Sequence, residues 1–323
     1  MILMKIGILT SGGDSPGMNA AIRACTRYAI SFGMEVYGIK RGYEGLMEGD
    51  IVEMDKRYVG NILHRGGTIL ETARSPRFMD EEGRKRAILV CESFGIDALV
   101  VIGGDGSMRG ALALSNESGI PVMCLPGTID NDLGYTDYTI GFDTAVNTVV
   151  DAVTKIRDTS SSHERTTVVE VMGRHCGDIA LYSGLACGAE SILVPEVPVD
   201  IPLICKRILQ AKNSGKKNNI IMKAEGVEMD AYEIAERIAA TTGVDAKVVV
   251  LSYIQRGGSP TSDDRMLATR TAVKAIELIH KGSESRAIGV DGDEVVHYPL
   301  EDALKMKREF RTNLLDIAVT ISQ

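Results

Sequence analysis

Two aspartates stand two residues apart after an apolar segment. The run IPVMCL at residues 120–125 leads into PGTIDND at 126–132, which contains Asp130 and Asp132. In an extended chain, residues i and i+2 point to the same side, so both carboxylates can face one point. Paired carboxylates with different roles are a common device of general acid–base catalysis. From this segment alone, an Asx-type turn with solvated acids is the alternative.

A third carboxylate follows the most apolar segment of the chain. ALVVIG at 98–103 runs into GGDGS at 103–107, where Asp105 stands between glycines. This carboxylate can hold Mg²⁺ against a nucleotide phosphate, and we expect Ser107 to cap the next helix. The alternative is a helix N-terminus with a capping acid. Because GGDG also occurs in NAD kinases and in lipid kinases of the diacylglycerol type, it indicates phosphoryl transfer rather than one substrate.

Other turns add glycines and cations. In SGGDSPG at 11–17, the glycines let the backbone approach a phosphate at a helix N-terminus, although a purely structural turn has the same pattern. KAEG at 223–226 places Glu225 at a strand end, where its carboxylate can accept a hydrogen bond from a sugar hydroxyl. Each single arginine in a turn is typical of an exposed surface, but five such turns favour clamps for a doubly charged phosphate. These five turns are HRGGT (64–68), TARSP (72–76), HERT (163–166), MGRHCGD (172–178) and QRGGSP (255–260).

The segments that must position these side chains alternate between short apolar strands and helices. Continuous β-branched runs predict strands buried on both faces, and their alternation with helices predicts parallel sheets. Ligands bind such sheets at the carboxyl ends of the strands, where the glycine-rich turns lie. SSSHER at 160–165 is the expected joint between two halves. Strands are predicted at 5–10, 36–39, 98–103, 120–125, 167–173, 191–196, 219–226 and 248–253, with a helix at 18–32.

Composition predicts a soluble, globular, cytoplasmic chain of about two domains. The chain has 323 residues, of which 44% are hydrophobic and 25% charged, and a domain has roughly 150 residues. The formal net charge of −8 argues against nucleic acid as a partner. No segment approaches the ~20 apolar residues of a membrane span, and the first residues do not resemble a signal peptide. Six cysteines without a CxxC pair favour reduced thiols.

The whole set of motifs resembles that of the bacterial 6-phosphofructokinases. The motifs follow the family's order and cover almost the entire chain: LTSGGDSPGMNAAIR, HRGGTILETAR, VVIGGDGS, PGTIDND, TIGFDTA, KIRDT, SHERT, EVMGRHCGD, AEGV and QRGGSPT. The resemblance implies a homotetramer of α/β chains, each with two doubly wound domains and mostly parallel sheets. It also implies phosphoryl transfer from ATP to fructose 6-phosphate, a step of glycolysis. The expected nucleotide-binding domain is 1–141 plus about 257–306, and the sugar-phosphate and effector domain is about 142–256 plus 307–323.

The resemblance implies roles for individual residues. Asp130 matches the general base for the sugar 1-hydroxyl, with Thr128 and Asp132 beside it, and Asp105 matches the Mg²⁺ ligand. The nucleotide site is matched by Gly13, Arg74, Ser75, Gly104, Asp105, Gly106 and Ser107. Arg74 and Arg174 match arginines beside the transferring phosphoryl group, Met172, Gly173 and Glu225 match sugar contacts, and Arg165 and Arg256 match 6-phosphate ligands. An intersubunit effector site for ADP or phosphoenolpyruvate is matched by Arg23, Arg27, Arg157, Gly188, Glu190, Lys216 and Lys217.

Several positions depart from the family pattern. The 6-phosphate pocket usually holds a further Arg and a His, which here are Lys247 and Tyr253. Lys lacks the planar fork of Arg, and Tyr does not become cationic near neutral pH. In the family, the position of Lys247 reaches the pocket from a neighbouring subunit. Gly106 and Gly127 stand where pyrophosphate-using relatives have Asp and Lys, which favours ATP. Two basic residues of the effector site are replaced, by Ser214 and Asn218.

Other functions stay open on the sequence. Lys247 and Tyr253 favour another acceptor, such as sedoheptulose 7-phosphate or tagatose 6-phosphate, as the nearest alternative. A pyrophosphate donor is a second alternative. A non-catalytic sensor of phospho-sugars is a third, and the presence of Asp105, Asp130 and Arg174 counts against it. A dehydrogenase is disfavoured because no GxGxxG is followed by an acidic residue about 20 positions on.

Overall fold

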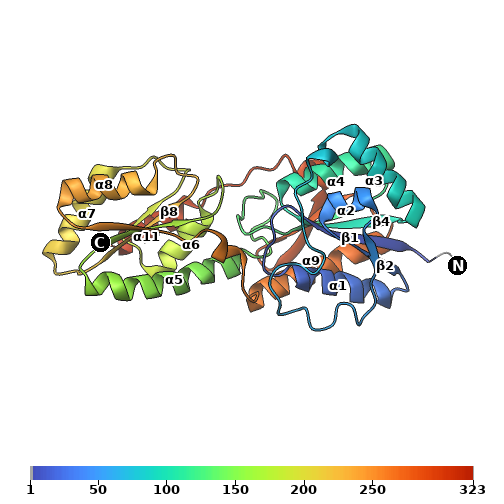
Figure 1. Ribbon diagram of the computed structural model, residues 1–323, viewed down its shortest axis with the longest axis horizontal. Helices are drawn as coiled ribbons and strands as arrows, with labels where there is room; N and C mark the ends of the chain where they lie inside the picture. The colour runs from blue at the N-terminus through green and yellow to red at the C-terminus, as the bar shows by residue number, and fades with distance from the viewer. Residues whose placement is uncertain (1–2, 323) are drawn as a thin grey trace. The chain divides into compact units, whose positions relative to one another are not determined.

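The structure is a computed structural model that describes residues 3–322. The chain forms two compact units, each assembled from separate stretches of sequence (Figure 1). Unit 1 comprises the described residues up to Ile129, Leu133–Thr144 and Arg256–Arg308. Unit 2 comprises Asp130–Asp132, Ala145–Gln255 and the described residues from Glu309 onward. Residues 160–165 lie inside unit 2, so the expected joint at SSSHER is wrong.

Unit 1 is built on a seven-stranded sheet. Its strands are β1 Lys5–Ser11, β2 Glu35–Ile39, β3 Ile51–Glu53, β4 Ala98–Gly103, β5 Val122–Pro126, β10 Arg286–Asp291 and β11 Glu294–Pro299. Their order is β11-β10-β5-β4-β1-β2-β3, and only the edge strands β3 and β11 run antiparallel to their neighbours. The helices are α1 Met18–Ser31, α2 Gly42–Glu48, α3 Glu81–Phe94, α4 Asp105–Ser118, α9 Ser262–His280 and α10 Leu300–Ala303, with a 3-10 turn η1 at Pro76–Met79.

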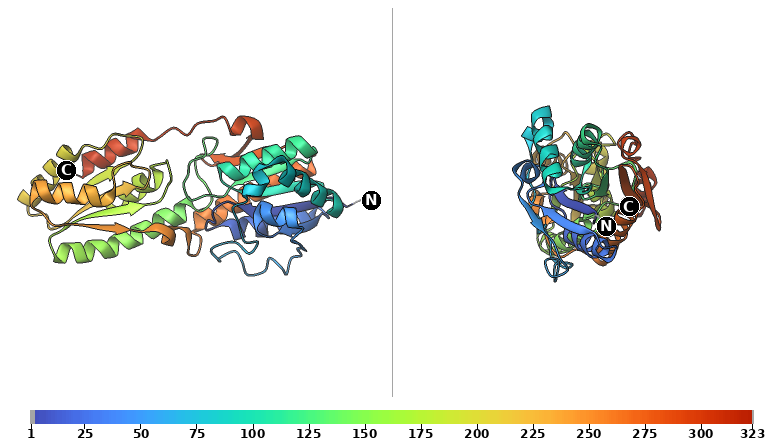
Figure 2. Two further views of the ribbon diagram at one scale, coloured as in Figure 1. Left: turned by 45° about the horizontal axis from the view of Figure 1, so that its top comes forward. Right: turned by 90° about the vertical axis from the view of Figure 1, so that its right-hand side faces the viewer.

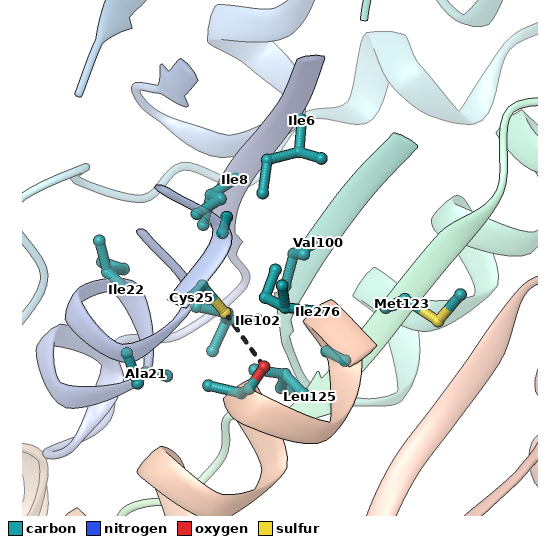
Figure 3. Packing of buried hydrophobic residues seen from close by; sticks show 14 of the residues in the cluster. Ile6, Ile8, Ala21, Ile22, Cys25, Val100, Ile102, Met123, Leu125 and Ile276 are labelled. Atoms are coloured by element: carbon teal, nitrogen blue, oxygen red, sulfur yellow. Dashed lines mark hydrogen bonds between the residues drawn. The ribbon is translucent and has the colours of Figure 1, made fainter. Parts of the chain in front are cut away.

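The core of unit 1 lies on both faces of this sheet. Helices α1 and α9 lie side by side on one face (Figure 2). Beneath them Ile102 of β4 packs with Ile276 of α9, and the Cys25 thiol of α1 donates to the Ala272 carbonyl at 4.0 Å (Figure 3). Residues of α2, α3 and α4 pack in a second cluster with Leu99 and other side chains of the opposite face. Burial raises the pKa of the Cys25 thiol, and all six cysteines are free.

Unit 2 carries a smaller sheet of four parallel strands. They are β6 Thr166–Val171, β7 Ser191–Leu193, β8 Asn219–Ala224 and β9 Ala246–Val250, in the order β7-β8-β6-β9. The helices are α5 Phe142–Ser162, which begins in unit 1, α6 Asp178–Cys187, α7 Ile201–Asn213, α8 Ala231–Thr242 and α11 Thr312–Ile321, with a 3-10 turn η2 at Ser252–Arg256. The prediction of an α/β fold with mostly parallel sheets is confirmed.

The strand predictions are wrong mostly at the edges of the two sheets. The strand predicted at 248–253 ends at Val250, and the chain then turns into η2. It is an edge strand with a 46% exposed Val250, so the expected burial on both faces is also wrong. Strands β3, β10 and β11 were not predicted at all; β3 and β11 are short or only partly buried edges, whereas β10 lies inside the sheet between β11 and β5. Within residues 3–322, no helix is both long and apolar enough to cross a membrane.

Candidate active site

Three glycine-rich loops of unit 1 leave the sheet at the carboxyl ends of neighbouring strands. Ser11 at the end of β1 lies opposite Gly103 at the end of β4, and Gly103 lies opposite Pro126 at the end of β5. The loops SGGD, GGDGS and PGT therefore begin side by side, at the edge where parallel sheets bind ligands. The strand register thus joins three motifs that are more than 20 residues apart in the sequence.

The loop after β1 has backbone close to other groups. A Cβ on Gly13 would lie 2.8 Å from Nη1 of Arg256, so this guanidinium lies directly against the backbone of the loop. Thr72 Oγ1 donates to the carbonyl of Gly12 at 2.9 Å and holds the segment that leads to Arg74 against the same loop. The structure therefore gathers a residue assigned to the nucleotide, Gly13, and one assigned to the 6-phosphate, Arg256, within unit 1.

The first turn of α4 begins at Asp105. The prediction that Ser107 caps this helix is wrong, because Gly104 is the N-cap residue and no side chain caps it. Ser107 is instead buried inside the first turn, and its carbonyl accepts a hydrogen bond from the Tyr43 hydroxyl at 2.6 Å. Asp105 binds Arg109 one turn further on, with 2.8 Å between Nε and Oδ2 and 3.0 Å between Nη2 and Oδ1.

The surroundings of Asp105 fit a magnesium–phosphate complex. Within residues 3–322, no group of three or more His, Cys, Asp or Glu side chains could hold a metal ion by itself. Mg²⁺ usually takes one or two carboxylates together with substrate phosphates, so one partly exposed carboxylate is a suitable protein ligand. A Cβ on Gly106 would meet no atom within 4 Å, so space is open there, whereas one on Gly127 would lie 2.9 Å from Cγ2 of Ile102. Packing alone therefore requires glycine at 127.

The segment from Asp130 to Asp132 belongs to unit 2 and is bent. Asn131 has a φ of 53°, so the extended geometry that was expected to point both carboxylates the same way is wrong. Asn131 is fully buried, and its Nδ2 donates to Oδ2 of Asp178 at 2.8 Å. Its carbonyl accepts from Sγ of Cys176 at 3.8 Å. These contacts fix the backbone on either side of Asn131, and Asp130 itself is only 5% exposed.

A second group of residues lies at the carboxyl edge of the unit 2 sheet. Val171 at the end of β6 lies opposite Ala224 at the end of β8, so the turn at Met172–Arg174 starts beside Glu225. Oε1 of Glu225 accepts hydrogen bonds from the backbone N–H of Gly173 at 3.1 Å and of Arg174 at 2.7 Å. The exposed side chain of Glu225 thus orients this turn.

Gln255 orients the same turn. This buried side chain accepts from the backbone N–H of Met172 at 3.2 Å and donates to the carbonyl of Ser252 at 3.0 Å. It therefore ties the Met172 turn to η2, which carries the 75% exposed Tyr253. The side chains of Tyr253 and Arg174 are exposed at this carboxyl end of the sheet.

Arg165 and Lys247 lie at the opposite end of this sheet. Arg165 precedes the first residue of β6, and Lys247 pairs with Thr167, the second residue of that strand. Both side chains bind Asp245, with Nε of Arg165 3.0 Å from Oδ2 and Nζ of Lys247 3.1 Å from Oδ1. Seven residues of extended chain separate Arg165 from Met172, which is about 23 Å along the strand. One copy of unit 2 therefore does not bring all of its expected sugar-phosphate ligands together.

Part of the expected effector set converges in unit 2. Arg157 donates to the carbonyls of Cys187 at 2.8 Å and Gly188 at 3.3 Å. Buried Glu190 lies with Oε1 2.6 Å from Nζ of Lys216 and 3.8 Å from Nη1 of Arg157. The exposed Lys217 follows, whereas Arg23 and Arg27 belong to α1 of unit 1.

A buried carboxylate holds the start of α5. Asp264, in the first turn of α9, accepts hydrogen bonds from the N–H of Gly141 at 2.7 Å and from the N–H and hydroxyl of Thr144 at 2.8 and 2.5 Å. Burial raises the pKa of Asp264 from 3.8 to about 6, although these hydrogen bonds oppose the shift. Asp264 therefore anchors the chain where it leaves unit 1 for unit 2.

Four positioning residues were not predicted from the sequence. The contact of Arg109 with Asp105 could have been predicted, because an Asp and an Arg four residues apart on a helix lie on one face. Asn131 had a weaker one, since Asn tolerates a positive φ better than most residues. Gln255 and Asp264 had none, because their partners are remote in the sequence.

Comparison with known proteins assigns the chain to a family. The sequence profile for phosphofructokinase matches residues 5–279. The chain is 55% identical over 321 residues to an ATP-dependent 6-phosphofructokinase of Clostridium botulinum (strain Loch Maree / Type A3), covering 99% of this chain and 100% of that protein. It is 54% identical over 320 residues to the enzyme of the same name from Clostridium tetani, with the same two shares.

Solved structures agree with this assignment. Phosphofructokinase from Saccharomyces cerevisiae superposes with a TM-score of 0.92 at 36% identity, over 99% of this chain and 48% of the yeast chain. A pyrophosphate-dependent phosphofructokinase from Marinobacter aquaeolei superposes with a TM-score of 0.86 at 20% identity, over 98% of this chain and 92% of that one, which shows the shared fold. The chain therefore belongs to the phosphofructokinase family.

Proposed function

We propose that the chain transfers the γ-phosphoryl group of ATP to the 1-hydroxyl of fructose 6-phosphate and so catalyses a step of glycolysis. The observation that carries this proposal is the register that joins the ends of β1, β4 and β5, since it clusters the SGGD, GGDGS and PGT loops. The full-length similarity to proteins named ATP-dependent 6-phosphofructokinase supports both the donor and the acceptor.

Unit 1 would bind the nucleotide. Gly13, Gly104 and Gly106 allow its phosphates to approach the backbone, and Asp105 would hold Mg²⁺ at the open space beside Gly106. When bound, the metal ion neutralises phosphate charge and orients the transferred group. Arg74 and Ser75 follow Thr72, which anchors their segment to the β1 loop. Arg74 and Arg174 offset the negative charge that develops in the transition state.

Asp130 would act as the general base. The reaction is a direct in-line displacement: the 1-hydroxyl oxygen forms a bond to the γ-phosphorus, the bond to the ADP oxygen breaks, and Asp130 takes the hydroxyl proton. A base must keep a fixed position to be effective, and the hydrogen bond of Asn131 to Asp178 holds the Asp130 backbone. Thr128 and Asp132 flank this position.

The sugar phosphate would be bound by ligands from two chains. Met172, Gly173, Arg174, Glu225 and Tyr253 lie at the carboxyl end of the unit 2 sheet, where Glu225 orients the turn. Arg165 and Lys247 lie about 23 Å away at the amino end, so they would serve the site of a neighbouring copy. The family resemblance also assigns Arg256 to the 6-phosphate. This arrangement supports an oligomer with sites shared between chains as the working form, and the family resemblance implies that it is a homotetramer in the cytoplasm.

The converging cations and carboxylate of unit 2 support an effector site for ADP or phosphoenolpyruvate. Arg157 and Lys216 both lie beside Glu190, and a phosphate would compete with this carboxylate for them. Lys217 and the exposed Gly188 flank these groups. The family resemblance also assigns Arg23 and Arg27 of α1 to this intersubunit site.

The function is tested by comparing acceptors and donors. Initial rates with MgATP are measured for fructose 6-phosphate, sedoheptulose 7-phosphate and tagatose 6-phosphate at matched concentrations. We expect fructose 6-phosphate to lead in kcat/KM by at least tenfold, about 1.4 kcal/mol. A higher kcat/KM for another sugar phosphate would indicate that Lys247 and Tyr253 change the acceptor specificity. A higher rate with pyrophosphate than with ATP would overturn the proposal that ATP is the phosphoryl donor.

A further inference from the structure

Arg109 occupies the carboxylate that the proposed metal site requires. Its Nε and Nη2 donate to the two different oxygens of Asp105, at 2.8 and 3.0 Å. This is the bidentate fork by which guanidinium groups bind carboxylates. With both oxygens bound to Arg109, neither has its full coordination capacity for a cation. A metal ion therefore has to displace or share this contact.

The ion pair between Arg109 and Asp105 is exposed and can be displaced easily. The two residues are four apart on successive turns of α4, and the side chains of Arg109 and Asp105 are 60% and 39% exposed. Exposed ion pairs at this spacing are weak and exchange easily with water and salt. A divalent cation that arrives with phosphate groups brings both a stronger partner for the carboxylate and new acceptors for the guanidinium.

Space for a nucleotide phosphate is open beside Asp105, because a Cβ on Gly106 would meet no atom within 4 Å. A phosphate bound there would carry negative charge close to the Asp105 carboxylate. Arg109 offsets the carboxylate charge as long as no metal ion does so.

We infer that Arg109 is a cation placeholder, which neutralises Asp105 before metal binding and leaves the carboxylate when the metal ion binds it. The inference rests on the proposed metal role of Asp105. Its consequence is that Arg109 limits how strongly nucleotide affinity depends on the metal. Without Arg109, the bare carboxylate repels a metal-free nucleotide, while the metal-bound nucleotide is affected much less because the metal ion screens the same charge.

The test measures binding rather than turnover. The dissociation constant of ADP is determined by calorimetry with excess Mg²⁺ and with excess chelator, for the protein and its variants, with phosphoenolpyruvate in excess to occupy the proposed effector site of unit 2. In Arg109→Met we expect the constant without metal to rise about tenfold, as loss of one charge near a diphosphate implies. The dissociation constant of ADP with Mg²⁺ should stay within about threefold of the wild-type value. The ratio of the two constants therefore rises several-fold, and Arg109→Lys, which keeps the charge, should largely restore it.

A matched control removes the same type of contact elsewhere. Arg237 binds Glu233 four residues away on α8 of unit 2, with exposed fractions of 53% and 45%. Arg237→Met should leave both ADP constants unchanged. A ratio in Arg109→Met equal to that of the wild type would overturn the placeholder role. Asp105→Asn separates the two claims: if Mg²⁺ still improves ADP binding in that variant as in the wild type, the metal role of Asp105 itself is wrong.

Discussion

Two inactive variants should restore each other's activity if sugar-phosphate sites are shared between chains. Asp130→Ser removes the proposed base from a chain's own site. Arg165→Ser removes a proposed 6-phosphate ligand that lies about 23 Å from Met172 along β6. Within one chain these two positions would serve different sites. Mixing the two variants therefore creates one intact site in each mixed pair of chains.

The expected recovery can be worked out from the geometry. Random pairing makes half of the shared interfaces mixed, and each mixed interface has one complete site out of two, so about one quarter of wild-type activity returns. Alone, Asp130→Ser loses most of kcat. Arg165→Ser loses charge-assisted hydrogen bonds of about 1.5–3 kcal/mol, which raises KM for fructose 6-phosphate roughly 10- to 150-fold.

The assay compares mixed and separate oligomers at one fructose 6-phosphate concentration. The two variants are coexpressed with different tags, purified through both tags and assayed below the KM of Arg165→Ser. Wild type carrying both tags is the positive control. Mixed oligomers no more active than the average of the two variants would refute shared sites and would place Arg165 outside the sugar site.

Further predictions concern the base, the pocket and the anchor of α5. Asp130→Ser should lower kcat by about 10²–10⁴ with little change in KM, and a near-normal kcat in steady-state assays would exclude Asp130 as the base. Lys247→Arg with Tyr253→His should lower the KM for fructose 6-phosphate, whereas a raised KM would indicate a pocket shaped for another acceptor. The raised pKa of Asp264, about 6, means that the folded state binds its proton more tightly than the unfolded chain. Relative to Asp264→Asn, the wild-type free energy of unfolding should therefore fall by up to about 3 kcal/mol as pH rises from about 4 to about 6, and urea unfolding that shows a pH-independent difference would contradict this.

Much of the fold was predictable because its signals are local. The apolar runs that became β1, β4, β5, β6 and β8 are buried strands, and a run of this kind is readable without knowing its neighbours. The edge strands β9 and β11 were misjudged or missed because an exposed edge carries no continuous apolar pattern. No local pattern marks the crossing points between the units, since α5 continues through one of them without a break, and the expected domain bounds came from the family resemblance.

The candidate site divides in the same way. The order and chemistry of the motifs, with Asp105, Asp130 and Arg174 each in its loop, are properties of the sequence alone and sufficed to indicate phosphoryl transfer. Tertiary structure decided which of these groups meet. Strand register brought the loops after Ser11, Gly103 and Pro126 together. It also placed the Arg165 and Met172 motifs at opposite ends of β6, because residues that are close in sequence separate by about 3.3 Å per position along a strand. The positive φ of Asn131 and its bond to Asp178 likewise depend on contacts 47 residues apart, which no local pattern encodes.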